Sequence, residues 1–314
     1  MPVRISWSQA LAWRMNRHLL NPIGMLPVAD VVRHLCAVQT QVASSAELAI
    51  RVRRQTSRAG EVNQALTDGR LIKTWAMRGA LHLLTPEEGG VFLSLLGGER
   101  LWEAWGRYLR LTPRQMETLR RTILAALEGP PVTKVELAEA VSARRGLAPA
   151  AAALRSSWGG LLTPFAWRGH LCSGPSQGTR VTFTRPDAMS TRWAGVPDPD
   201  EAAPLAIARY LRAYAPATVN ELRAWLGVDK RRLRSWYRSV EDQMVEITVG
   251  GEPAHVLAED LDELVSTRPT RAVRLLPGFD QYVLGPGTAD GHVVPGARRA
   301  AVSRPAGWIS PVVV

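Results

Sequence analysis

The feature that most constrains the fold is a repeated pattern of short amphipathic helices followed by a small hairpin. Apolar residues recur at helical spacing, and each helical stretch is followed by a strand-like pattern with a glycine in its middle. The first such glycine is Gly79. An internal repeat of this kind determines how the whole chain is divided. In the first copy we expect helices over 7–20, 28–38, 44–52 and 62–67 and a hairpin over 70–84.

The pattern recurs twice more. Trp75…Arg78-Gly79…Leu81 and Trp167-Arg168-Gly169…Leu171 are expected to occupy the same structural position in the first two copies. In the third copy, Gly250-Gly251 marks the turn of the hairpin. The second copy is expected to have helices over 134–143 and 150–159 and strands over 165–171 and 181–183, and the third copy helices over 204–214, 218–226 and 229–237 and strands over 245–249 and 255–257.

Three helices and a hairpin form the winged-helix pattern, so we predict a mainly α chain with small β wings, an α+β fold of tandem winged helices. A Pro- and Asp-rich linker at 193–203 separates the second and third copies. The apolar end Val312-Val313-Val314 has no expected partner strand, so we expect the C-terminal part to be incomplete. The predicted domains are winged helices at 1–85, 86–190 and 200–265, and a C-terminal β-rich segment at 266–314.

The positive charge lies in the first half of the chain. The net charge is +11, and residues 1–85 contain eleven Lys or Arg against four Asp or Glu. Nearly all these cations are arginines, which pair with phosphate through two parallel hydrogen bonds. The charge favours a nucleic acid partner, and double-stranded DNA in particular once winged helices are considered. Composition alone leaves a basic enzyme with solvated arginines as the alternative.

Several other classes are excluded or disfavoured by composition. No run of about 18 apolar residues predicts a membrane span, and the N-terminus lacks a signal pattern, so we expect a cytoplasmic protein. The only two cysteines, Cys36 and Cys172, lie in apolar contexts and are expected to be buried thiols. We expect no metal and no other cofactor. Nothing indicates an obligate dimer, so a monomer is expected.

Basic residues in the first and third copies are candidate DNA contacts. Arg51, Arg53 and Arg54 are expected on the third helix, where a helix-turn-helix places its recognition face. Arg78 could contact phosphate or pack its stem on Trp75.

Two further candidates come from the first wing and from the third copy. His82, at the end of the wing, could contact a phosphate or a damaged base, or could be a packing residue. Lys230, Arg231 and Arg232 form a second cluster expected to face phosphates.

A pair of neutral amides, Gln39 and Gln41, stands at the junction between the helices at 28–38 and 44–52. Residues two apart on an α-helix point about 200° from each other, whereas in an extended segment they share a face. The two amides can therefore serve one site only outside regular helix. The alternative is that they cap the next helix or bond to backbone.

The order of these motifs resembles a known family. A Gln-x-Gln turn, the Trp75…Leu81-His82 wing, a second wing, a third winged helix and Leu275-Leu276-Pro277-Gly278-Phe279-Asp280 resemble the AlkZ/YcaQ-like winged-helix DNA glycosylases over nearly the whole chain. The resemblance implies three tandem winged helices and a C-terminal β-rich part around a DNA channel. It also implies catalytic roles for Gln39 and Gln41, as in the AlkZ-like branch, with Thr40 where that branch has an apolar residue.

Glutamine chemistry limits the substrates that such an enzyme could use. A carboxamide neither protonates a leaving base nor deprotonates water, but it donates and accepts hydrogen bonds. That is adequate for a cationic N-alkylated purine such as an N7-alkylguanine or a crosslink, because its glycosidic bond is already weakened. We therefore expect a monofunctional DNA glycosylase in DNA repair or toxin self-resistance. The alternatives are a non-catalytic winged-helix regulator and a protein-interaction scaffold.

Overall fold

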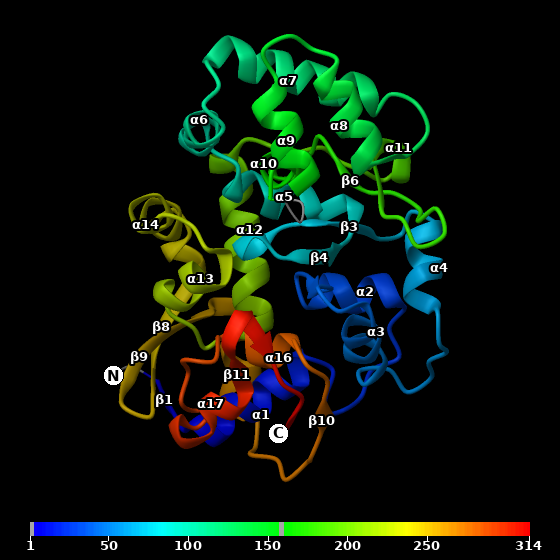
Figure 1. The fold of residues 1–314 in the computed structure, drawn as a ribbon. Coiled ribbons are helices and arrows are strands. Elements are labelled where there is room, and N and C mark those ends of the chain that lie inside the picture. The colour runs from blue at the N-terminus through cyan, green and yellow to red at the C-terminus, as the bar shows by residue number, and fades with distance from the viewer. Residues whose placement is uncertain (1–2, 157–159) are drawn as a thin grey trace. The chain divides into compact units, whose positions relative to one another are not determined.

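The computed structural model describes residues 3–156 and 160–314 (Figure 1). The chain forms two compact units, one of residues 1–63 and 200–314 and the other of residues 64–199. Helices dominate, and the strands form small separate sheets of two or three. The predicted α+β class is confirmed. The four-part division into winged helices and a C-terminal segment stays a prediction.

The first helix of the first unit is α1 (Trp7–Arg17), which Ser6 caps through its side chain. Strand β1 (Arg4–Ile5) precedes this helix and pairs in parallel with β8 (Met244–Val249). The other elements of the N-terminal part are α2 (Val28–His34), β2 (Val38–Gln39) and α3 (Ala43–Arg51).

The same unit continues after residue 200 with the elements predicted for the third copy, three helices followed by a hairpin. Thr218 and Glu221 form the capping box expected of a helix start, and β8 and β9 pair antiparallel across Gly250-Gly251. These elements confirm the helices and the hairpin predicted there. They are α12 (Pro199–Tyr214), α13 (Val219–Leu226), α14 (Lys230–Arg238), a 3₁₀ turn (Glu241–Gln243), β8 and β9 (Glu252–Leu257).

The C-terminal part is a mixture of short helices and strands packed on α1. The chain end is not unpartnered, because Val312↔Leu276 and Val313↔Leu275 pair antiparallel. The expectation of an open apolar strand is therefore wrong. The elements are α15 (Leu261–Ser266), β10 (Leu275–Leu276), α16 (Gln281–Leu284), α17 (Arg299–Val302), β11 (Ser303–Arg304), β12 (Trp308–Ile309) and β13 (Val312–Val313), with 3₁₀ turns at Ala258–Asp260, Gly296–Arg298 and Pro305–Gly307.

The second unit has its own apolar core, to which Leu119, Leu137 and Phe165 contribute. Its first hairpin confirms the predicted wing, with Ile72↔Leu84 and Trp75↔Leu81 paired. The unit comprises most of α4 (Glu61–Thr67), then β3 (Ile72–Trp75), a 3₁₀ turn (Met77–Gly79), β4 (Leu81–Leu84), α5 (Pro86–Leu96), α6 (Glu99–Tyr108), α7 (Pro113–Ala126), β5 (Val132–Thr133), α8 (Lys134–Ser142), α9 (Ala148–Ser156), α10 (Thr163–Trp167), β6 (Cys172–Ser173), β7 (Thr182–Thr184) and α11 (Pro186–Met189). The end of the helix predicted over 150–159 lies outside the described residues.

The predicted equivalence of the first two wings is wrong. Trp75 ends strand β3, but Trp167 ends helix α10. Pro164 fixes the backbone angle suited to the first turn of that helix, and Phe165 packs into the core. The hairpin of the second copy is therefore only β6 and β7, which pair as Cys172↔Thr184 and Ser173↔Phe183.

A buried ion pair joins the end of α3 to the start of α16. Nη1 and Nη2 of Arg53 each donate to one carboxylate oxygen of Asp280 at 2.7 Å, and both side chains are 0% exposed. Asp280 also accepts from the backbone N–H of Tyr282 at 2.8 Å and so caps α16. This one carboxylate therefore holds the C-terminal segment against the N-terminal helices of the same unit.

We expect Asp280→Ala to lower the free energy of unfolding by about 3–5 kcal/mol, because the guanidinium of Arg53 is then buried without its counter-ion. Urea unfolding followed by circular dichroism measures this loss. The double variant Arg53→Met/Asp280→Leu should recover most of it, since no charge remains buried. A single variant within ~1 kcal/mol of wild type would contradict the structural role of the pair.

Candidate functional site

The Gln-x-Gln segment is not helical. Helix α2 ends at His34, Cys36 has a left-handed backbone with φ of 65°, and the chain is then extended through Gln39 in β2. Gln41 lies in a bend before α3 begins. The geometric requirement stated from the sequence is met, because residues two apart in an extended segment can face the same way.

Two hydrogen bonds between α12 and residues 35 and 36 hold the turn that leads into this segment. The Tyr214 hydroxyl donates to the carbonyl oxygen of Leu35 at 2.8 Å, and the Cys36 thiol donates to the carbonyl oxygen of Arg209 at 3.2 Å. A non-glycine residue at positive φ is strained unless its surroundings hold it. We call these two contacts the α12 clasp.

The environment of Tyr214 keeps its hydroxyl a donor. The side chain is fully buried, and burial raises the pKa of Tyr214 well above its ordinary value. Its ring lies so close to Gly285 that a Cβ there would be 2.0 Å from Cε1. Only glycine fits at that position, so the ring is fixed between α12 and the end of α16.

The two carboxamides are not used to build the fold. Gln39 is 8% exposed and Gln41 is exposed, and neither side chain makes a hydrogen bond within the described parts of the chain. Val42 precedes α3 without a side-chain cap. Glu47, in this helix, does not cap its start either, since it accepts from the backbone N–H of Gly60 at 3.0 Å.

The two helices that chain order matches with α3 each begin with a structural residue. Thr133 ends β5 and is the N-cap of α8, Thr218 is the N-cap of α13, and each forms a capping box with the Glu three residues later. Those threonines satisfy backbone N–H groups at the helix start. At the start of α3 the N-cap residue is Val42, and Gln39 and Gln41 precede it and cap nothing, which disfavours the capping interpretation.

The three arginines expected on a recognition face do not form one. Arg53 is buried against Asp280, so its prediction as a DNA contact is corrected. Arg54 pairs with Glu61 at 2.5 Å and donates to the carbonyl oxygen of Leu26, which gives it a structural role instead. Arg51 is half-buried and donates to the hydroxyl of Ser57 at 3.3 Å.

The reason is the order of the elements. Counting helix, short strand, helix, helix and hairpin along the chain makes α4, not α3, the helix that matches α9 and α14. Helix α3 ends at Arg51, so Arg53 and Arg54 follow it. Because the prediction from the sequence counted α1 as the first helix of this copy, it assigned the recognition face to α3, one helix too early.

His82 is an interior residue. Its side chain is 0% exposed, and Nδ1 lies 2.9 Å from the carbonyl oxygen of Ala80. Burial, aided by the charge of Arg78, lowers the pKa of His82 to about 3, so the ring is neutral at physiological pH. The prediction that it contacts a phosphate or a lesion is corrected to the packing alternative.

Arg78, in contrast, is exposed between β3 and β4 with φ of 56°. The cations of helix α14 are exposed to solvent. Asp229 caps the first turn of this helix by accepting from the backbone N–H groups of Arg231 and Arg232. Arg232 also stacks on Trp236 at 4.7 Å. The exposed cations of α14 are Lys230, Arg231, Arg232, Arg234 and Arg238.

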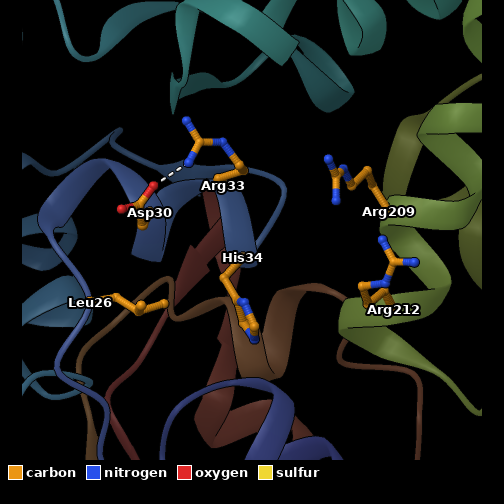
Figure 2. A pocket seen from close by; sticks show the side chains of 6 residues that line it. All are labelled: Leu26, Asp30, Arg33, His34, Arg209 and Arg212. Atoms are coloured by element: carbon orange, nitrogen blue, oxygen red, sulfur yellow. Dashed lines mark hydrogen bonds and ion pairs between the residues drawn. The ribbon is translucent and has the colours of Figure 1, made fainter. Parts of the chain in front are cut away.

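Sequence reasoning missed a cluster of basic residues next to the clasp. Arg33 and His34 at the end of α2 and Arg209 and Arg212 on α12 line one pocket (Figure 2). Residues 33 and 34 lie on α2, and residues 209 and 212 lie on α12, far along the chain. No local spacing in the sequence therefore indicates the cluster. In the described residues no group of three or more His, Cys, Asp and Glu is arranged to hold a metal.

Comparison with known proteins decides the family. The family model described as DNA glycosylase AlkZ-like matches residues 32–314. The chain belongs to the AlkZ-like DNA glycosylases. A curated relative from Streptomyces sahachiroi, named interstrand DNA cross-link repair glycosylase, is 45% identical over 99% of this chain and 86% of its own length. The solved structure of the S. sahachiroi DNA glycosylase AlkZ aligns with a TM-score of 0.94 at 45% identity and the same coverage.

These findings confirm the resemblance stated from the sequence, the enzyme class and DNA as the substrate. The segment that the clasp holds carries Gln39 and Gln41, the two residues to which the resemblance stated from the sequence assigns catalysis. No helix in the described ranges is long and apolar enough to cross a bilayer.

We expect Tyr214→Phe to slow base release by tenfold to a hundredfold at saturating enzyme, because a small displacement of a catalytic segment has an effect of that order. The dissociation constant for DNA should change little, since Tyr214 is buried. The matched control is Tyr210→Phe, whose hydroxyl contacts the carbonyl of Gly285 at 3.4 Å rather than Leu35. Equal rates for the two variants would contradict the positioning role.

Proposed function

We propose that the glycosylase hydrolyses the N-glycosidic bond of cationic N-alkylated purines in DNA, N7-alkylguanine adducts above all, through Gln39 and Gln41. The observation that carries the proposal is the pair of carboxamides in a non-helical segment, without a hydrogen bond to the described residues, just before a helix that they do not cap. Polar side chains held at a fixed place without a structural partner are available for a substrate.

The chemistry assigns different work to the substrate and to the protein. Glycosidases of neutral sugars need a carboxylic acid and a carboxylate. A guanine alkylated at N7 is already a cation, so its departure needs no proton. The carboxamide oxygens can orient a water and stabilise the developing oxocarbenium ion, and the N–H₂ groups can bond to the leaving base.

The curated relative is named for interstrand crosslink repair. We extend this to the present chain: both strands of a crosslink carry an alkylated purine, and each such base is a cationic leaving group of the same kind. A role in repair or in self-resistance to a crosslinking toxin follows from that substrate.

Binding of the DNA backbone is assigned to four exposed cations and to the half-buried Arg51. Arg78 at the tip of the first wing, Arg51 after the Gln segment, and Lys230, Arg231 and Arg232 on α14 are proposed phosphate contacts. Asp229 satisfies two N–H groups at the start of α14, so the arginine side chains rather than the helix end supply the binding.

The test is single-turnover release of 7-methylguanine from alkylated duplex DNA with excess enzyme. Gln39→Ala and Gln41→Ala should each lower the rate by about 10²–10³, the cost of removing one preorganised polar group. Unmodified guanine should not be released. Gln55→Ala is the control, because Gln55 is an exposed amide of the same unit that bonds to the carbonyl of Ile23.

Absence of release by wild-type enzyme, together with intact DNA binding, would reject the proposed substrate. Unchanged rates in both glutamine variants would reject the proposed residues while leaving the activity in place.

A further inference from the structure

A second polar feature of the first unit is a cavity of about 210 Å³ between α2 and α12. Arg33 projects from α2 on one side, and Arg209 and Arg212 project from α12 on the other (Figure 2). His34 lies at the end of α2 in the same lining, and Leu26 supplies an apolar wall. Three arginines from two helices therefore line one small cavity.

Carboxylates contact this cluster. Asp30 is the one carboxylate in the described lining, and it pairs with Arg33. Glu259, 62% exposed, pairs with Arg212. A guanidinium carries five N–H donors, so one carboxylate contact does not exhaust it.

The pKa of His34 is affected by its burial and by nearby arginine charges. Burial and the charges of Arg17, Arg212 and Arg209 lower its pKa from the ordinary value. The ring is thus neutral at physiological pH. An anion that entered the cavity would oppose the arginine charges and raise that pKa.

Building on the proposed function, we propose that this cavity is a phosphate-binding site that holds one backbone phosphate of the DNA substrate and sets its register against the Gln segment. Planar guanidinium groups bind phosphate oxygens in pairs, and the cavity is large enough for a phosphodiester with part of its sugar.

The site is linked to the catalytic segment by covalent and hydrogen-bonded connections. His34 precedes Gln39 by five residues, and the backbone oxygen of Arg209 accepts from the Cys36 thiol of the clasp. Five residues span at most about 17 Å of extended chain. DNA rises about 3.4 Å per base along each strand, so this backbone span corresponds to about five nucleotides, and we expect the bound phosphate in that range of the base that Gln39 serves.

The first measurement is DNA binding over a range of salt concentrations. Arg209→Gln and Arg212→Gln should each weaken binding to damaged and undamaged duplex alike, by about tenfold at low salt. The slope of log K against log salt should fall by about one for each lost phosphate contact. Arg4→Gln, an exposed arginine on β1 of the same unit, is the control and should leave the slope unchanged.

The second measurement identifies the phosphate. A single uncharged methylphosphonate is moved along duplexes that contain one 7-methylguanine, and each is bound to wild type and to Arg209→Gln. One position within five nucleotides of the lesion should weaken wild-type binding and have no further effect in the variant. Such coupling assigns the contact, because independent changes add.

Inorganic phosphate distinguishes the other source of the same chemistry. If the His34 imidazole titration, followed by NMR, shifts upward at low phosphate while no methylphosphonate position couples to Arg209, the site takes free phosphate and the DNA assignment is overturned. If neither responds, the site itself is refuted. Base release that persists in either case would show that the proposed function stands without it.

Discussion

The conformation of the segment that carries Gln39 and Gln41 depends on one hydrogen bond above all, from the buried Tyr214 hydroxyl to the carbonyl oxygen of Leu35. Together with the Cys36 thiol it holds a left-handed residue at the end of α2 and so turns helix into extended chain. Without that turn α2 would continue, and Gln39 and Gln41 would point apart. A typical hydrogen bond contributes only about 1 kcal/mol to stability, so its importance lies in the conformation it selects.

The start of α3 differs from the starts of the helices that chain order matches with it. Helices α8 and α13 each begin with a threonine in a capping box. The N-cap residue of α3 is Val42, which leaves the helix without a side-chain cap, and Gln39 and Gln41 precede it without a hydrogen bond to the described residues. The anchoring that a cap would have provided comes instead from α12 and from the Arg53–Asp280 pair.

Local patterns predicted much of this architecture. The capping box at Thr218 and the Gly250-Gly251 turn are short-range signals, and the structure has both. The predicted roles of Arg53 and His82 failed because burial depends on partners far along the chain, such as Asp280, 227 residues away. The basic cavity was missed for the same reason, since its two walls come from α2 and α12. Assigning Gln39 and Gln41 required the family resemblance, because a turn with two glutamines has no chemical signature of its own.

The central claim is that uncharged side chains suffice because the leaving base is already a cation. The most direct test is the pH dependence of single-turnover release of 7-methylguanine, divided at each pH by the spontaneous release rate so that ionisation of the lesion cancels. The account predicts a ratio that stays flat between about pH 5.5 and 8.5, since carboxamides do not titrate and His82, with a pKa of about 3, stays neutral. A bell-shaped ratio would reveal an essential acid and base and would contradict the account.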